Sequence, residues 1–141
     1  MKDVLIEIKG TQGLDNDENV IELTTVGQMA FKNGKYYLFY NDGESLGQVG
    51  VKTTLKTDGN NHVVINRSGT LESRLSIKNG QRSQCFYSTE YGQIMLGIFG
   101  ESIVNNLTDN GGSLSMCYTI DANNGLISRN KVEINVREVN K

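Results

Sequence analysis

Turn-forming Asn-Gly and Asp-Gly pairs recur along the chain, and no other feature constrains its fold as strongly. Both residues of such a pair tolerate the positive φ angles of a tight two-residue turn, so the pair is a strong hairpin signal. These pairs, or longer Asn- and Gly-rich variants, stand at residues 33–34, 58–61, 79–80, 109–112 and 123–125. The segments between them alternate apolar and polar side chains, which is the period of a half-buried β-strand.

Successive hairpins of short strands predict an antiparallel meander. We expect strands at residues 3–11, 20–31, 34–40, 49–57, 62–68, 74–78, 82–89, 93–107, 113–120 and 132–137. No segment combines a capping box with a helical apolar stripe, so no helix is expected. Gly27 is expected to bend or bulge its strand, and the segment around Gly97 and Gly100 is interpreted as a bent strand rather than a helical turn.

About eight to ten strands on 141 residues fit either a β-sandwich or an up-and-down barrel. The exposed edge strands of a sandwich are normally protected by prolines or inward charges. The chain has no proline and shows little other edge protection, whereas a closed barrel needs none. We therefore predict an all-β fold: residues 1–141 form a single domain, an antiparallel up-and-down barrel of about 8–10 strands.

The segment from Gly34 to Tyr40 carries bulky apolar side chains on both faces. Strands of this kind are usually central in a sheet and covered on both sides. The segment therefore predicts a well-covered sheet with a core on one face. It indicates no chemistry by itself.

Composition excludes several functional classes. The formal net charge of −2 predicts neither a nucleic-acid partner nor an anionic membrane surface. Cys85 and Cys117 are too few for a disulfide scaffold and lack metal-ligand spacing. Because charged residues interrupt the first positions and no apolar run approaches a membrane span, we expect neither a signal peptide nor a membrane segment. A reducing cytoplasm is the expected location.

The acidic segment around residue 17 resembles the start of a calcium-binding loop. Asp15, Asp17 and Asn19 are spaced two residues apart, as in an EF-hand. The match then fails, because Val20 stands at the glycine position and Val26 at the bidentate position. We interpret the segment as a solvated turn and expect no metal.

Catalytic motifs are also not expected. His62 is the only histidine, and a dyad with Cys85 or Cys117 is conceivable. Neither thiol stands in a nucleophile motif or begins a helix that would lower its pKa, and no glycine cluster has the pattern of a phosphate-binding loop. We therefore expect no enzyme and no cofactor.

Arg67 is the first candidate for binding. It follows Val63 and Ile65 at the two-residue period, so it is expected to point inward with them. An arginine inside a barrel must find acceptors, because an uncompensated buried charge is costly. Two interpretations remain open: an anchor for a ligand carboxylate or phosphate, or a strand-end arginine that reaches the rim or pairs with Glu22.

Inward aromatic residues leave the same alternatives. The period places Tyr36, Tyr40, Tyr87 and Tyr118 inside, together with Met116. Apolar walls with a few polar groups suit a small amphipathic ligand, but a barrel that binds nothing also uses tyrosines near its rim. A barrel of about eight strands is either filled by side chains or just able to hold one small ligand.

The order of motifs resembles the uncharacterised YwiB-like family of Gram-positive bacteria, nearly from end to end. The resemblance rests on residues 8–12 (IKGTQ), 21–25 (IELTT), 34–40 (GKYYLFY), 54–56 (TLK), 67–69 (RSG), 85–89 (CFYST) and the strand at 114–118. It implies a calycin-like barrel, distantly similar to lipocalins and fatty-acid-binding proteins, in a cytosolic bacterial protein without assigned catalytic residues. The Arg-x-Tyr pair of many fatty-acid-binding proteins is absent, because Glu138-Val139 follow Arg137, which argues against simple fatty-acid carriage.

The sequence is compatible with two functional hypotheses. The first is a non-enzymatic cytosolic barrel that binds a small, partly apolar or amphipathic ligand inside. The second is a filled barrel whose outer surface, at Tyr37 and Phe39, binds another protein or a second copy of the chain.

Overall fold

The described part of the chain forms ten antiparallel strands that close into a barrel. The computed structural model describes residues 1–14, 17–41, 52–69, 73–89, 92–122 and 125–139. The strands are β1 (Lys2–Leu14), β2 (Asp17–Lys32), β3 (Lys35–Asn41), β4 (Lys52–Asp58), β5 (His62–Ser68), β6 (Ser73–Lys78), β7 (Arg82–Thr89), β8 (Gly92–Thr108), β9 (Gly111–Ala122) and β10 (Gly125–Glu138). Each pairs with its neighbours in sequence, and β10 pairs with β1. The predicted all-β, up-and-down barrel is confirmed.

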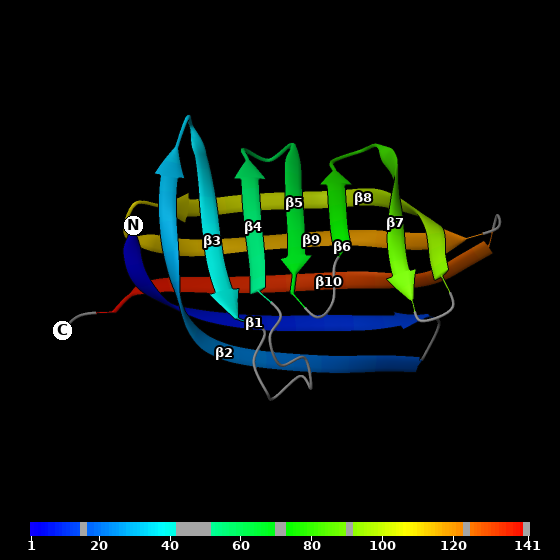
Figure 1. Ribbon diagram of the computed structural model, residues 1–141, viewed down its shortest axis with the longest axis horizontal. Coiled ribbons are helices and arrows are strands. Elements are labelled where there is room, and N and C mark those ends of the chain that lie inside the picture. The colour runs from blue at the N-terminus through cyan, green and yellow to red at the C-terminus, as the bar shows by residue number, and fades with distance from the viewer. Residues whose placement is uncertain (15–16, 42–51, 70–72, 90–91, 123–124, 140–141) are drawn as a thin grey trace.

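Long and short strands form the two sides of the barrel. β1, β2, β8, β9 and β10 are long, whereas β3 to β7 have six to eight residues each. Figure 1 shows the short strands lying across the long ones. Within the described ranges, no helix has the length and apolar character needed to cross a membrane.

Strand β2 joins these two sides by bending at Gly27, as the sequence predicts. Residues up to Met29 pair with β1, and residues from Gln28 onward pair with β3. Figure 1 shows β2 curving from the side of β1 to the side of β3. A Cβ at Gly27 would collide with the carbonyl oxygen of Phe39, so the close approach of the two strands requires glycine.

Strand β8 is also a bent strand, as expected, and not a helical turn. Its pairing with β9 shifts register between Gly100 and Ser102. The turn between β6 and β7 packs there, because the N–H of Gly80 donates to the carbonyl of Gly100 and the N–H of Gly100 donates to the carbonyl of Gln81. The bulge therefore holds the tip of one hairpin against the long strand.

The packed core lies around the first half of β1. Inward side chains from nearly all strands meet there and are buried: Val4, Ile6, Met29, Leu38, Leu55, Val63, Ile65, Ile77, Ile98, Ile103, Leu107, Leu114, Met116, Tyr118, Ile134 and Val136. Each fully buried side chain of this size contributes about 1.5–3 kcal/mol to folding. The core therefore holds the two sides of the barrel together.

The strand β3 needs one correction. Leu38 is fully buried inside the barrel, and Tyr36 and Tyr40 pack against the same core. Tyr37 and Phe39 lie on the outer face and are only partly buried. The predicted cover on both faces is therefore wrong for the outer face, which presents aromatic rings at the surface.

Candidate functional site

Beyond Ile8 the interior is no longer filled and opens into two adjoining cavities. The inner cavity has a volume of about 310 Å³ and is lined by buried apolar residues such as Leu55 and Ile65. The outer cavity has a volume of about 500 Å³ and reaches the surface at the exposed Ile127. The two share six lining residues: Gly10, Ile21, Arg67, Leu75, Tyr118 and Val132.

Arg67 stands in the wall that the two cavities share. It comes from β5, two residues after Ile65, so the inward direction predicted from the period is confirmed. Glu22, the alternative partner considered for it, lies exposed on the outside of β2, beside Glu7 and Lys9. The guanidinium therefore brings a positive charge to the junction of two largely apolar spaces.

Tyr118 lies in the same shared wall, on β9, and is only 8 % exposed. Burial raises the pKa of its hydroxyl, and the nearby charge of Arg67 opposes that rise. The hydroxyl is therefore protonated at neutral pH and can donate or accept a hydrogen bond. Tyr40, on β3, lines the inner cavity as well.

A buried polar pair on β10 lines the outer cavity. The side-chain amide of Asn130 donates a hydrogen bond of 3.1 Å to the hydroxyl oxygen of Ser128. Both side chains are buried. Sequence reasoning missed them, although the inward phase of Val132 and Ile134, continued backward by two residues at a time, leads to both positions.

Three of the six predicted binding residues, Tyr40, Arg67 and Tyr118, come together at the cavities. Met116 is fully buried in the packed core instead. Tyr36 lies toward the opposite end of the barrel, where its hydroxyl donates to a carboxylate oxygen of Asp109 at 3.0 Å. The structure therefore separates these two residues from the cavities. The side chain of Tyr87 lies outside the described residues.

The Cys-His dyads considered from the sequence do not form. Cys85 faces inward and lines the outer cavity, where burial raises the pKa of its thiol. His62 lies on the outside of β5, with its Nε2 atom 2.6 Å from the hydroxyl oxygen of Ser76. Cys117 lies between the inward residues Met116 and Tyr118, on the outer face of β9. The imidazole is thus not beside either thiol.

The calcium-like segment is only partly visible. Asp15 lies outside the described residues, as does the side chain of Asp17. In the ranges that the structure describes, no group of three or more His, Cys, Asp or Glu side chains is arranged to hold a metal ion. The expectation of no metal therefore stays a prediction.

Comparisons with known proteins agree with the barrel and with the resemblance seen in the sequence. A family model described as a domain of unknown function (DUF1934) matches residues 6–134. The uncharacterized beta-barrel protein YwiB of Bacillus subtilis (strain 168) is 28 % identical over 115 residues, covering 82 % of this chain and 79 % of the relative. The crystal structure of ywiB protein from Bacillus subtilis matches with a TM-score of 0.84 and 24 % identity, over 99 % of this chain and 93 % of that chain. The structural match shows the fold, and the family match spans most of the barrel. The chain belongs to the DUF1934 family of β-barrel proteins.

Proposed function

We propose that this protein binds a small, partly apolar anion inside the barrel. The observation that carries the proposal is the position of Arg67, between an apolar inner cavity and an outer cavity that reaches the surface. Ligand pockets in proteins have volumes of roughly 300–1,000 Å³ and are mostly apolar with a few polar groups. Both cavities fall in this range.

The lining favours a ligand with two parts. Among the described residues around the inner cavity, Arg67 carries the single charge, and the rest are apolar apart from two tyrosines and a glycine. Arg74 and Lys131 are the further cations around the outer cavity, and Lys131 also pairs with Glu133 at 3.2 Å. No described carboxylate lines either space, so an anionic head group is attracted and a cation is repelled. An apolar tail then fits the inner cavity.

Carboxylate and phosphate suit Arg67 for a geometric reason. A guanidinium presents parallel N–H donors that match the oxygens of these anions, and such charge-assisted hydrogen bonds are stronger than neutral ones. The hydroxyls of Tyr40 and Tyr118 add further polar contacts in the same region. The proposal therefore covers both head groups, of which the carboxylate is the first to test.

Binding rather than catalysis is part of the same proposal. Cys85 and Tyr118 are the titratable side chains beside Arg67 whose pKa values are raised, so both are protonated at neutral pH. Protonated groups of this kind are poor nucleophiles and poor general bases. Two free cysteines fit the cytoplasm as the place where the protein acts, and the closed meander fits a calycin-like relationship.

The test uses three probes with one tail and different heads: octanoate, 1-octanol and octylamine. We expect octanoate to bind, with octanol weaker and octylamine weakest, as measured by isothermal titration calorimetry. Arg67→Met should weaken octanoate by about tenfold or more, since a hydrogen bond to a charged group is worth about 1.5–3 kcal/mol. Arg82→Met, on the outer surface, serves as the matched control.

Native mass spectrometry of gently purified protein adds an independent readout. An extra mass that is lost on denaturation supports an internal ligand and gives its identity. If no probe binds, no mass co-purifies and Arg67→Met behaves like Arg82→Met, the proposal is refuted. If octanol binds as tightly as octanoate, the anionic part of the proposal fails.

A further inference from the structure

The outward side chains of β3, β4, β5 and β6 form one continuous surface, which we call the basic-aromatic face. Strand register fixes its rows: Tyr37 is paired with Lys56, which is paired with Val64. The next row runs from Phe39 through residues 54 and 66 to Arg74. Directly paired side chains on one face of a sheet lie about 4.5–5.5 Å apart at Cβ, so the rows are contiguous.

Positive charge dominates this face. Its cations are Lys35, Lys52, Lys56, Arg74 and Lys78, and Asp58 is the one carboxylate that the described strands add to it. The ion pairs seen among the described residues involve other cations, namely Lys2, Arg82, Arg129, Lys131 and Arg137. Among the described residues none of the five cations forms an ion pair, and they outnumber Asp58, which favours a positive potential over the described part of the face.

The cations of this face also act on the imidazole of His62. Its pKa is lowered, first by burial and then by the charge of Lys78, with smaller contributions of the same sign from Arg74 and Lys56. Asp58 acts in the opposite direction but does not reverse the shift. Three cations of the face thus act on this histidine together, and one carboxylate acts against them.

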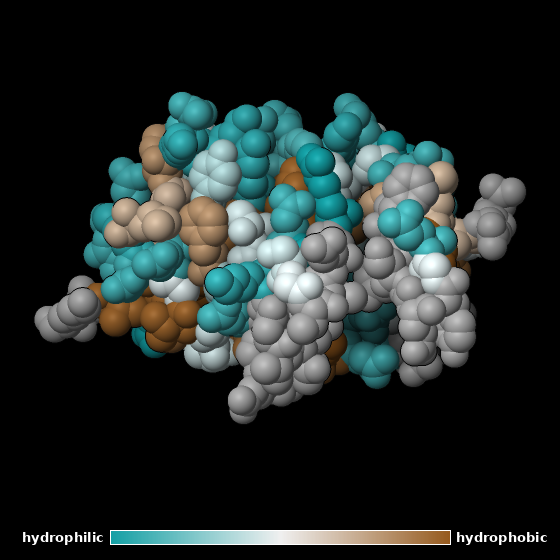
Figure 2. All heavy atoms as spheres, viewed as in Figure 1, coloured by the Kyte–Doolittle hydropathy of each residue, from teal (hydrophilic) through white to brown (hydrophobic). Residues whose placement is uncertain are grey.

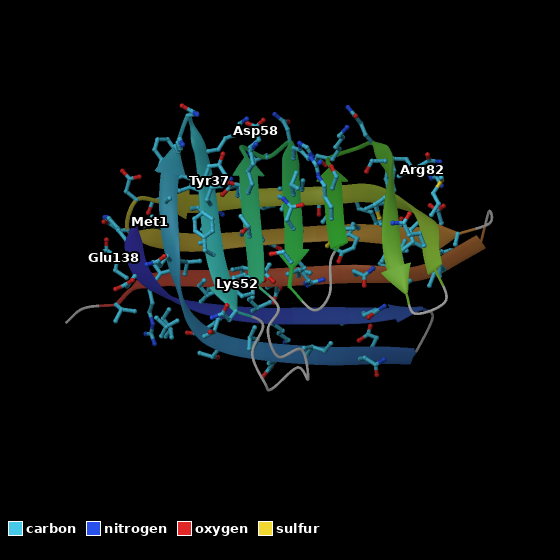
Figure 3. The ribbon with its side chains drawn as sticks, viewed as in Figure 1. Met1, Tyr37, Lys52, Asp58, Arg82 and Glu138 are labelled. Atoms are coloured by element: carbon cyan, nitrogen blue, oxygen red, sulfur yellow. The ribbon has the colours of Figure 1, made fainter. Side chains whose placement is uncertain are left out.

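Aromatic rings stand beside the charges. Tyr37 and Phe39 lie nearly parallel, with an interplanar angle of 5° and ring centroids 6.2 Å apart. The Nζ atom of Lys56 lies 5.9 Å from the centroid of the Tyr37 ring. In Figure 3, Tyr37 lies on β3 and Lys52 on the neighbouring β4. Figure 2 shows the face from the front, with hydrophilic side chains over β4 to β6 and a more hydrophobic area toward β2 and β3.

We propose that the basic-aromatic face binds single-stranded nucleic acid. Proteins that bind single strands without sequence preference combine cations that follow the phosphates with aromatic rings on which bases stack. Tyr37 and Phe39 provide the stacking rings, and Lys52 and Lys56 on the neighbouring strand β4 provide cations beside them. Arg74 provides a further cation at the far end of the Phe39 row. This site lies on the outside of the barrel and shares only Arg74 with the lining of the outer cavity.

Other macromolecules fit this face less well. A duplex is read by an element that enters a groove, and the face is a sheet surface without such an element. An acidic peptide would use the cations but offers no flat ring to the parallel aromatics. The net charge of −2 by itself predicts no nucleic-acid partner. A net charge does not show how the charges are distributed, and here cations gather on one face.

The test measures fluorescence anisotropy of a labelled 15-nucleotide oligo(U) RNA between 20 and 300 mM salt. We expect salt-dependent binding by the wild-type protein. Lys56→Gln with Arg74→Gln should reduce the slope of log K against log salt by about 1.4, since each phosphate contact on a single strand contributes about 0.7. Lys9→Gln with Arg137→Gln removes the same charges from β1 and β10 and should change little.

The aromatic part has its own variant. Tyr37→Leu with Phe39→Leu should weaken RNA binding at least about fivefold at unchanged salt slope, because stacking is lost while the charges remain. Circular dichroism and the urea midpoint establish that each variant is folded. Arg67→Met should leave RNA binding unchanged, which separates this site from the interior one.

Each alternative outcome overturns the proposal. Absence of RNA binding by the wild type refutes it, as does equal weakening by the β1/β10 control. If a ten-residue polyglutamate peptide competes as well as RNA and the leucine variant has no effect, the face takes an acidic protein instead. If sedimentation shows a dimer that only the leucine variant dissociates, and RNA binding is absent, the rings serve self-association.

Discussion

A pair of identical substitutions on neighbouring strands tests whether the interior is open. Leu38 on β3 and Leu55 on β4 are direct register partners, and both are 0 % exposed. Leu38 lies in the packed core, whereas Leu55 also lines the inner cavity of about 310 Å³. Replacing each leucine by phenylalanine therefore adds the same atoms at equal burial, once into filled space and once beside empty space.

The two substitutions are expected to change the free energy of unfolding differently, with a loss at Leu38 and little change or a gain at Leu55. At Leu38 the larger ring overpacks the core, which costs about 1–3 kcal/mol of unfolding free energy. At Leu55 the ring extends into the cavity without strain, and the added apolar burial contributes up to about 1 kcal/mol. We expect Leu55→Phe to be more stable than Leu38→Phe by about 1–4 kcal/mol. Leu55→Phe should also weaken octanoate binding, because it occupies the space proposed for the tail.

Urea unfolding measures this difference through the midpoint at constant m-value. Thermal melts give a second readout, since 1 kcal/mol corresponds to about 2–4 °C for a chain of this size. Equal destabilisation by the two substitutions would mean that the interior at Leu55 is packed as tightly as at Leu38. The barrel would then be filled, and the interior binding proposal would lose its site.

Three further predictions concern the bend and two titrating groups. Gly27→Ala should lower the free energy of unfolding in urea by at least about 2 kcal/mol, because its Cβ collides with a backbone carbonyl. Gly125→Ala, whose Cβ has its nearest contact at 3.6 Å, should lower it far less. Equal losses of stability would contradict the bend. The pKa of Asp121 is lowered by its hydrogen bonds from Arg82. The stabilisation from this pair is therefore present above the ordinary pKa of an aspartate and is lost as pH falls through the pKa of Asp121 in the folded protein. In Arg82→Gln the pKa of Asp121 measured by NMR should rise, and an unchanged pKa would exclude the pairing. Since the pKa of His62 is lowered, the unfolded chain takes up the proton first as pH falls below 6.5. Stability should therefore decrease from that pH toward the pKa of His62 in the folded protein. Thermal melts from pH 7.5 to 5 measure this decrease. If the melting temperature of a His62→Gln variant falls with pH as steeply as that of the wild type, another group is responsible.

The hairpins could be predicted because their signals are local. Asn33 and Gly34 adopt φ angles of 55° and 78°, which is the positive-φ turn that the pair indicates. The strand predicted at 62–68 has those bounds in the structure, and the one predicted at 93–107 differs by one residue at each end. Turn chemistry and side-chain alternation act within a few residues, so sequence alone contains them.

The last strand shows where local patterns fail. The alternation that predicts it covers only 132–137, after the turn at 123–125, whereas the strand begins at Gly125. The missed half places Ser128 and Asn130 inward, so the apolar alternation that marks a strand is not visible there. The same polar side chains line the outer cavity. The part of the strand that sequence reasoning missed is therefore a part that forms the candidate site.

Periodicity also gives the face of a residue but not its level in the barrel. Tyr36, Met116 and Tyr118 all have the inward phase, yet only Tyr118 reaches the cavities. Whether a level is filled depends on residues from distant strands that meet there. One register row runs from Ile103 through Met116 and Val132 to Gly10. The row is packed at Met116 and borders the cavities at Val132 and Gly10, where the glycine contributes no side chain. That information is tertiary and is absent from any single segment.

The distribution of polar groups along β1 and β10 links this architecture to function. Side chains such as Ser128 and Asn130 would be costly in a dry apolar core, because their mutual hydrogen bond satisfies only part of their capacity. They are tolerable where water or a ligand meets the remaining groups, which is the situation at the wall of the outer cavity. The filled end around Val4 and Val136 supplies the stability, so the opposite end is free to keep polar groups and empty space. Substitutions in the filled end, at the level of β1 before Ile8, should therefore change the free energy of unfolding more than ligand affinity. Substitutions in the cavity end, at the level of β1 beyond Ile8, should change ligand affinity more than the free energy of unfolding.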